Sequence, residues 1–180
     1  MEINLLVLVD SSDKENYRVS KSTILPFLEH FGILYQKIDL AKEITTDFNA
    51  SGILVTQEGL GEKLSKETKE SLYQAVRKGM GLINLDYHLN FWKELLEPLR
   101  IEQIEDEDKT SSLRIGKTHY INQLQQPEAE KILHQPLEFL KVKVKKEPLL
   151  FANNGSPLLL TSSSIRLAQF LISPKLWLPE

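Results

Sequence analysis

No cysteine occurs among the 180 residues of the chain, so disulfide bonds, zinc–thiolate sites and a cysteine nucleophile are excluded. No apolar run approaches the about 20 residues that a helix needs to cross a bilayer. The first residues read as a strand and lack the basic segment and long apolar core of a signal peptide. We therefore predict neither a signal peptide nor a membrane partner, and by default a cytoplasmic location.

A large excess of either charge is also missing. The chain has 22 Lys and Arg residues against 25 Asp and Glu residues, which gives a net charge of −3 at pH 7. This balance provides no broad attraction to phosphate backbones, so nucleic acid is not predicted as a partner. The most basic segment holds Lys141, Lys143, Lys145 and Lys146. Its lysines alternate with apolar residues, which indicates the solvent face or the charged edge of a strand.

Metal and phosphate motifs are missing as well. The four histidines show no His-x-x-x-His or Glu-x-x-His spacing, so no metal site is predicted. The segment EGLGEKLS at residues 58–65 lacks the gap of a phosphate loop, and its acidic residues would repel phosphate. Gly79-Met80-Gly81 precedes a predicted strand instead of following one. The sequence therefore predicts no cofactor, and a flavodoxin-like cofactor binder is the least supported of three functional hypotheses.

The chain does contain a βαβ unit, at residues 52–86. An apolar run is followed by a polar, glycine-bearing loop, a helix that Ser65 caps, a glycine turn and a second apolar run. Parallel strands need such a crossover. Further strands are predicted at residues 3–9 and 33–40, and further helices at residues 19–30 and 88–96, the last ended by Pro98. Residues 1–100 are thus expected to form a parallel α/β half.

The pattern changes after residue 100. Short β-leaning segments dominate there, with one predicted helix at residues 127–133 and a hairpin turn at residues 153–156. We expect residues 101–180 to form a β-rich half that packs on or extends the same sheet, so that both halves make one structural domain. The predicted fold is a flavodoxin-like or amidotransferase-like three-layer α/β sandwich, with a mostly parallel sheet and a β-rich C-terminal extension. The apolar end either packs on this domain or marks a piece of a longer protein.

Polar residues follow three of the predicted parallel strands. In open α/β sheets, ligands gather beyond the carboxyl ends of the strands, so these residues are the candidate binding site. Asp86, His88 and Glu58 are candidate catalytic residues, with Asp86 and His88 acting as base and acid if their side chains meet. The competing interpretation is that Asp10 and Asp86 cap the helices that follow them. The candidate binding residues at the strand ends are Asp10, Ser11, Gln57, Glu58, Gly59, Asp86, Tyr87 and His88.

The order of these segments resembles the class I glutamine amidotransferase-like superfamily, and within it the trehalose-utilisation-like branch. The matching segments are INLLVLVD at residues 3–10, LPFLEHFGILYQKIDL at residues 25–40 and the βαβ unit at residues 52–86. His119-Tyr120-Ile121 looks like the His-Pro-Ile segment of such proteins, so the resemblance adds His119 to the candidate binding residues.

The chain departs from that family at the nucleophile. Amidotransferases carry a cysteine at the bend after the strand, partnered by His and Glu, whereas this chain has Asp86-Tyr87 there and no cysteine. Glutamine hydrolysis by a thiolate is therefore excluded. The resemblance then implies a non-catalytic domain with a binding or assembly role linked to carbohydrate metabolism. The alternative is a hydrolase or sugar-modifying enzyme that uses Asp10, Glu58, Asp86 and His88.

The expected partner is accordingly a carbohydrate or a neighbouring protein domain. Self-association into a homo-oligomer is left open, as are the ligand and the pathway.

Overall fold

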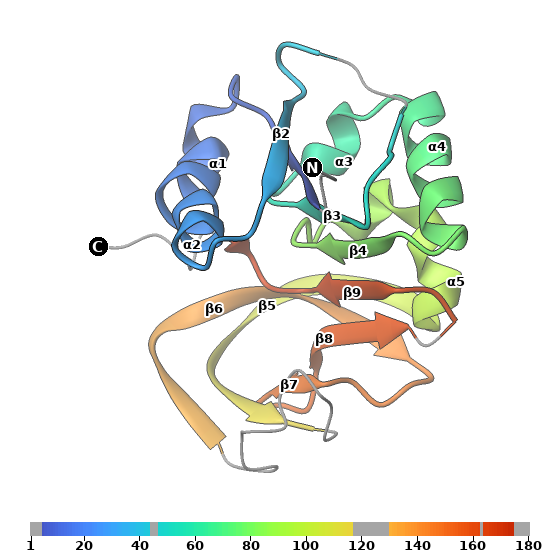
Figure 1. Cartoon of the computed structure of the whole chain (residues 1–180). Helices are drawn as coiled ribbons and strands as arrows, with labels where there is room; N and C mark the ends of the chain where they lie inside the picture. Colours follow the sequence, from blue (N-terminus) through green and yellow to red (C-terminus); the bar gives the residue numbers. More distant parts are fainter. Residues whose placement is uncertain (1–4, 44–46, 117–129, 163, 175–180) are drawn as a thin grey trace.

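A single mixed sheet organises the computed structural model, which describes residues 5–43, 47–116, 130–162 and 164–174 (Figure 1). In these residues the sheet has nine strands, in the order β2-β1-β3-β4-β9-β8-β7-β5-β6. The strands are β1 (Leu5–Val9), β2 (Tyr35–Asp39), β3 (Gly52–Val55), β4 (Gly81–Asn84), β5 (Ile101–Ile115), β6 (Glu130–Val144), β7 (Leu150–Ala152), β8 (Pro157–Ser162) and β9 (Leu167–Phe170).

The prediction of a mostly parallel sheet is wrong. Strands β2, β1, β3, β4 and β9 run parallel, but every pairing from β9 through β8, β7 and β5 to β6 is antiparallel. The physical reason is the connection between strands. A parallel neighbour needs a crossover, and after residue 115 the described segments contain no helix to provide one. The strand end at which the candidate residues lie is nevertheless common to β1, β3 and β4.

The first helical segment is longer than predicted. It comprises α1 (Lys14–Val19), a π-helical turn (Ser20–Ile24) and α2 (Leu25–His30). It begins early because Asp13 caps it, accepting a bond from the backbone N–H of Asn16 at 3.1 Å. Pro26 cannot donate a backbone hydrogen bond, and the wider π turn directly before α2 accommodates the missing donor.

The remaining helices are α3 (Leu60–Lys63), α4 (Lys66–Arg77) and α5 (Leu96–Leu99). Ser65 caps α4 as predicted, through a 3.0 Å bond from the N–H of Thr68. The helix predicted at residues 88–96 is instead two 3₁₀ turns, Leu89–Phe91 and Lys93–Leu95, which lead into α5. Pro98 does not end that segment, because it lies in the first turn of α5, where its missing N–H costs nothing.

The helix predicted at residues 127–133 is also wrong where it is described, because β6 begins at Glu130. Residues 127–129 lie outside the described part of the chain.

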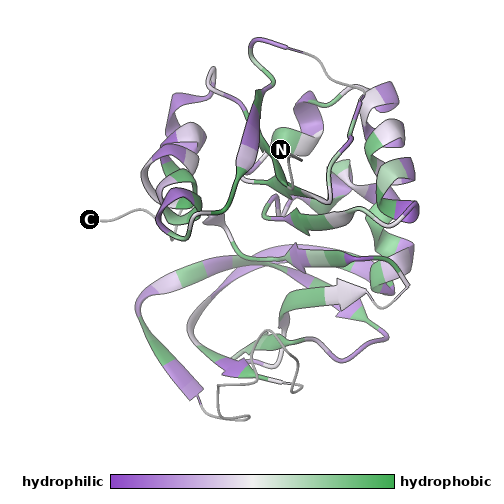
Figure 2. Cartoon of the chain, in the orientation of Figure 1, coloured by the Kyte–Doolittle hydropathy of each residue, from purple (hydrophilic) through white to green (hydrophobic). Residues whose placement is uncertain are grey.

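Alternation along β1 divides the core into two layers. Leu6 and Leu8 point to the face covered by α3, α4 and α5, whereas Val7 and Val9 point to the face covered by α1 and α2. Figure 2 shows hydrophobic residues along these central strands and hydrophilic residues on the outer turns of the helices. Both faces of β1 are buried, as expected for a central parallel strand. The polar loops at its carboxyl end are thus held on a rigid base.

A third apolar cluster lies beneath the antiparallel strands and includes Leu137, Phe139 and Leu158. On the solvent side, lysines of β6 and of the residue directly after it pair with acidic residues of β5. Lys143 Nζ lies 3.2 Å from Glu105 Oε1, and Lys145 Nζ lies 2.5 Å from Glu102 Oε1. The lysine-rich segment is therefore the wet face of the edge strand β6, and its charges are balanced by the neighbouring strand.

We predict that Phe139→Ala destabilises the chain by about 3–5 kcal/mol, because the ring is fully buried and its removal leaves a cavity. The matched control is Ile132→Ala on the same strand, where the side chain is 85% exposed and the change should stay within about 0.5 kcal/mol. Urea unfolding of both variants measures the difference. Equal losses at the two positions would show that the third cluster is not packed as described.

Candidate functional site

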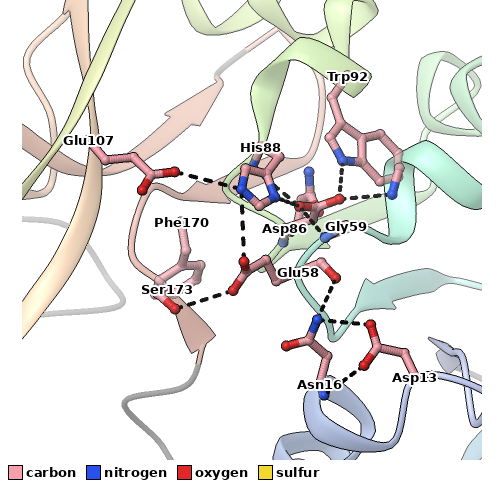
Figure 3. Close-up of polar contacts among 12 residues, drawn as sticks. Asp13, Asn16, Glu58, Gly59, Asp86, His88, Trp92, Glu107, Phe170 and Ser173 are labelled. Carbon is pink, nitrogen blue, oxygen red and sulfur yellow. Dashed lines mark hydrogen bonds and ion pairs between the residues drawn. The ribbon is translucent and has the colours of Figure 1, made fainter.

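Asp86 is the buried centre of the strand-end loops. It follows β4, and its carboxylate accepts four hydrogen bonds, from the backbone N–H groups of Gly59 (3.0 Å), Gly61 (2.8 Å) and His88 (3.2 Å) and from Trp92 Nε1 (2.9 Å) (Figure 3). The residue has no solvent exposure. A buried carboxylate needs such donors, because an unpaired charge away from water is very costly. Asp86 therefore fastens the loop after β3 to the loop after β4.

Gly61 and Trp92 fit together beside this carboxylate. A side chain at Gly61 would place its Cβ 2.5 Å from Trp92 Nε1 and 2.9 Å from the Cβ of Phe91. Only glycine lets the α3 backbone approach closely enough for its N–H to reach Asp86 while the indole donates to the same oxygen.

The backbone on the other side of Asp86 is held by β9. Gln169 donates to the carbonyl oxygen of Asp86 at 3.0 Å, and Asn84 Nδ2 donates to Gln169 Oε1 at 2.8 Å. Asn84 Oδ1 in turn accepts from the Asp86 N–H at 3.0 Å. All three residues are fully buried. This network fixes the bend after β4 from both sides.

Asp10 forms a second polar cluster, at the end of β1. Gln57 bonds to its backbone in both directions, at 2.5 Å and 3.2 Å, and Ser12 donates to its carboxylate through both N–H (2.8 Å) and hydroxyl (2.6 Å). Lys63 from α3 forms an ion pair with the same carboxylate. Burial alone would raise the pKa of Asp10, but the bonds from Lys63 and Ser12 outweigh it and the pKa is lowered.

Ser11 takes no part in that cluster and bonds instead to β2. Its N–H donates to Asp39 Oδ1 at 2.9 Å. Burial opposes ionisation of Asp39, but the bonds from Ser11 and Ala41 lower its pKa overall. Asp10 and Asp39 thus hold the loop that precedes α1.

Tyr87 is buried to 3% exposure, and its ring stacks on His88 with centroids 4.5 Å apart. Desolvation, reinforced by the nearby charges of Glu58 and Glu107, raises the pKa of the phenol strongly. The hydroxyl therefore stays protonated in the accessible pH range and acts as a donor, not as a base.

His88 is the partly exposed member of the set, with 31% of its side chain accessible. Its imidazole lies between carboxylates from three segments. Nε2 is 3.9 Å from Glu58 Oε1 and 3.7 Å from Glu107 Oε1, and Nδ1 is 3.7 Å from Asp86 Oδ1 (Figure 3). All three distances exceed that of a hydrogen bond. Asp86 and His88 therefore lie together without forming the hydrogen-bonded acid–base pair that sequence reasoning considered.

Glu58 connects this cluster to the rest of the rim. Ser173 Oγ lies 3.5 Å from Glu58 Oε2, and Asn16 Nδ2 lies 3.5 Å from its carbonyl oxygen. Gly59, in the left-handed region with φ of 76°, turns the chain so that its N–H faces Asp86. The loop after β3 is thus packed against α1, β4 and the segment after β9.

The structure places the sequence-predicted residues in two groups. Asp10 and Gln57 form one, with Lys63 as a partner that sequence reasoning missed; Glu58, Asp86 and His88 form the other, with Trp92 and Glu107 missed. Neither aspartate caps the helical segment that follows it, since Asp13 caps α1 and His88 is the N-cap of the 3₁₀ turn Leu89–Phe91. His119 lies outside the described residues.

The sequence offered a clue to two of the three missed residues. Lys63 and Trp92 lie within ten residues of a predicted site residue. Glu107 comes from a distant strand, and only its pairing in the sheet brings it to His88.

Within the described residues, no group of three or more His, Asp or Glu side chains has the arrangement of a metal site. None of the helices in these residues has the length and apolar character needed to cross a bilayer.

Comparisons with known proteins rest on structure alone, because no family model and no curated protein matches the sequence. A ThuA-like protein from Bacteroides uniformis aligns over 98% of this chain and 87% of its own, with a TM-score of 0.69 and 10% identity. A glutamine amidotransferase from Thermotoga maritima aligns over 97% of this chain and 77% of its own, with a TM-score of 0.57 and 8% identity. The chain has the amidotransferase-like fold.

The expectation drawn from the resemblance is thus confirmed for the fold. A third similar structure is the exo-β-1,4-mannosidase Op5Man5 from an Opitutaceae bacterium, with a TM-score of 0.56 and 12% identity. It covers 97% of this chain, but this chain spans only 32% of the mannosidase. The fold therefore occurs there as one part of a much longer chain.

We predict that Asp86→Asn destabilises the chain by about 2–4 kcal/mol, because an amide group would set a donor against existing donors. Asp106→Asn is the matched control, since Asp106 is exposed on β5 and should change stability by less than about 0.5 kcal/mol. Chemical unfolding at neutral pH measures both variants. A neutral effect of Asp86→Asn would contradict the four-donor arrangement.

Stability should also depend on the ionisation of Asp10. Its pKa is lower in the folded chain than the ordinary value of 3.8, so ionised Asp10 stabilises the fold above that pH. We expect the stability advantage of the wild type over Asp10→Asn to be constant at neutral pH and to shrink as the pH falls below 3.8. Unfolding curves across this range test the prediction, and Lys63→Met should reduce the advantage at neutral pH. An advantage that grows on acidification would contradict a lowered pKa for Asp10.

Proposed function

We propose that the chain is a non-catalytic amidotransferase-like domain with a binding or assembly role in carbohydrate metabolism. The observation that carries this proposal is that an aspartate, Asp86, stands where a catalytic cysteine would be expected. This residue occupies the bend after β4, where the family resemblance implies a catalytic cysteine, and the chain contains no cysteine.

The surroundings of Asp86 favour a structural role. Both carboxylate oxygens are engaged, each by two donors, and solvent does not reach the side chain. A nucleophile or general base must contact the substrate, and Asp86 would have to break two buried bonds to free either oxygen. Asp10 is similarly committed to Ser12 and Lys63. Both aspartates therefore stabilise the loops in which they lie.

The carbohydrate link is supported by the structures that share the fold. One is ThuA-like, and another is a mannosidase in which the matching region is about a third of the chain. A domain of this size, without a nucleophile, suits a role beside a catalytic domain. We therefore propose a neighbouring domain of a carbohydrate-active enzyme, or a saccharide, as the partner, and a single structural domain as the unit that engages it.

An exposed apolar patch on α2 and the loop after it supports an assembly role. Phe27 and Phe31 are 57% and 62% exposed, and their rings lie 4.6 Å apart. Ile33 and Leu34 extend the patch toward β2. Contiguous exposed apolar residues of this kind mark interaction surfaces in soluble proteins.

A second candidate function rests on His88. Its imidazole is partly exposed and lies between Glu58 and Glu107, so it could transfer a proton to a bound substrate. This arrangement favours the alternative, a hydrolase or sugar-modifying enzyme, in a form that uses His88 and Glu58 without Asp86.

One assay separates the two functions. Turnover of glutamine, 4-nitrophenyl acetate and a set of 4-nitrophenyl glycosides is measured with the wild type, His88→Gln and Glu58→Gln. A non-catalytic domain should give rates equal to those of the buffer for all three proteins. Thermal unfolding of each variant confirms that it is folded. A wild-type rate above the buffer rate that drops at least tenfold in either variant would replace the first proposal by the second.

A further inference from the structure

An open groove lies at the end of the sheet opposite to the candidate site. It encloses about 690 Å³ at the amino ends of β1, β3 and β4, and the turn between β8 and β9 forms one wall. In Figure 1 this is the side on which the β8–β9 turn approaches the end of α4. The volume lies within the about 300–1,000 Å³ that is usual for small-molecule sites.

The floor of the groove is apolar and lacks side chains at two strand starts. Gly52 and Gly81 begin β3 and β4, and a Cβ at Gly81 would meet no atom closer than 3.7 Å. Leu5, Ile83 and Ile165 are among the apolar lining residues. The groove therefore offers an apolar surface to a ligand, and the two glycines leave room for it.

Arginines line the same groove. Arg77 and Arg166 both border it, and Arg77 also borders an adjoining pocket of about 270 Å³ that contains Arg100. The two pockets share Ser164 and Ile165, so they form one continuous surface.

The positions of two of these arginines are well defined by their contacts. The Arg77 guanidinium lies 4.6 Å from the centroid of the Tyr73 ring, and its Nη2 is 3.4 Å from the Tyr73 hydroxyl. The backbone of Arg166 is fixed by a 2.7 Å bond from the N–H of Leu82, and its Cβ lies beside Gly81. The Arg77 guanidinium is thus held against Tyr73, and Arg166 is held at the wall of the groove directly before β9.

No ion pair between described residues neutralises the charges of these arginines. Among the described residues, every ion pair is formed by a lysine or a histidine, and none involves an arginine. Glu97 is the one carboxylate among the described residues that line the two pockets. Three guanidinium groups against one carboxylate leave the rim with a net positive charge, although the chain as a whole is acidic. Guanidinium groups recognise carboxylate, sulfonate and phosphate groups through paired N–H donors.

We propose that this groove is a binding site for a small amphipathic anion. The apolar body of the ligand lies over the starts of β3 and β4, and its anionic group is bound by Arg166 and Arg77. The site is remote from Asp86 and independent of the function proposed above, so neither proposal depends on the other.

The probe for the test is 1-anilinonaphthalene-8-sulfonate, which carries an apolar body and one anionic group, with the neutral N-phenyl-1-naphthylamine for comparison. Fluorescence titration of the full chain should show saturable binding of the sulfonate. Arg166→Gln and Arg77→Gln should each weaken it about fivefold, the upper range for an exposed ion pair. The neutral dye should bind these variants as it binds the wild type. Arg18→Gln, an exposed arginine on α1, is the matched control and should change neither dye.

Two further variants locate the dye. Ala168→Phe should fill the groove, which Ala168 lines, and weaken both dyes, whereas Phe31→Ser on the α2 patch should weaken neither. Thermal unfolding checks that Ala168→Phe is folded. If it is not, the proposal is tested by the arginine variants alone. Loss of dye binding in Phe31→Ser, no saturable binding, or equal effects of Arg18→Gln and Arg166→Gln would each overturn the proposal.

Discussion

A single buried carboxylate organises the end of the sheet at which the candidate site lies. Asp86 gathers N–H donors from the loop after β3, from α3, from its own loop and from the Trp92 ring. An unpaired donor or acceptor in this water-free environment would cost free energy. We therefore expect these segments to fold cooperatively around the carboxylate. The position of α3, the course of the 3₁₀ turns and the location of His88 all follow from that requirement.

The same residue also connects the parallel strands to the antiparallel ones. Gln169 of β9 holds the backbone of Asp86 and pairs with Asn84 of β4. His88 extends the contact to Glu107 of β5. Polar links therefore run from the parallel strands to the antiparallel ones beside the hydrophobic core. These links fix the bend after β4 relative to both β9 and β5.

Much of the parallel part could be predicted from the sequence, because its signals are local. The continuous apolar run of β1, the Ser65 cap and the glycine turn before β4 each depend on a few neighbouring residues. The antiparallel part was harder to predict. Residues 130–133 looked helical, and only their pairing with β5 makes them a strand. Strand direction depends on which distant segments meet, and local patterns do not record that.

For the candidate site, the sequence predicted which residues share an edge of the sheet but not how their side chains pair. Because β1, β3 and β4 run parallel, Asp10, Glu58 and Asp86 lie at one edge of the sheet. Their separation into a lysine-bound and a donor-bound cluster depends on Lys63 and Trp92. The directions of those side chains follow from packing, which a strand pattern does not contain.

The close fit of Gly61 against the Trp92 ring has a consequence for inheritance. Any larger residue at position 61 collides with the indole, and a smaller residue at position 92 leaves Asp86 with one donor fewer. Neither position can therefore be substituted alone while Asp86 remains buried with all four donors. In a set of descendants, the two should change in the same lineages, together with Asp86 itself.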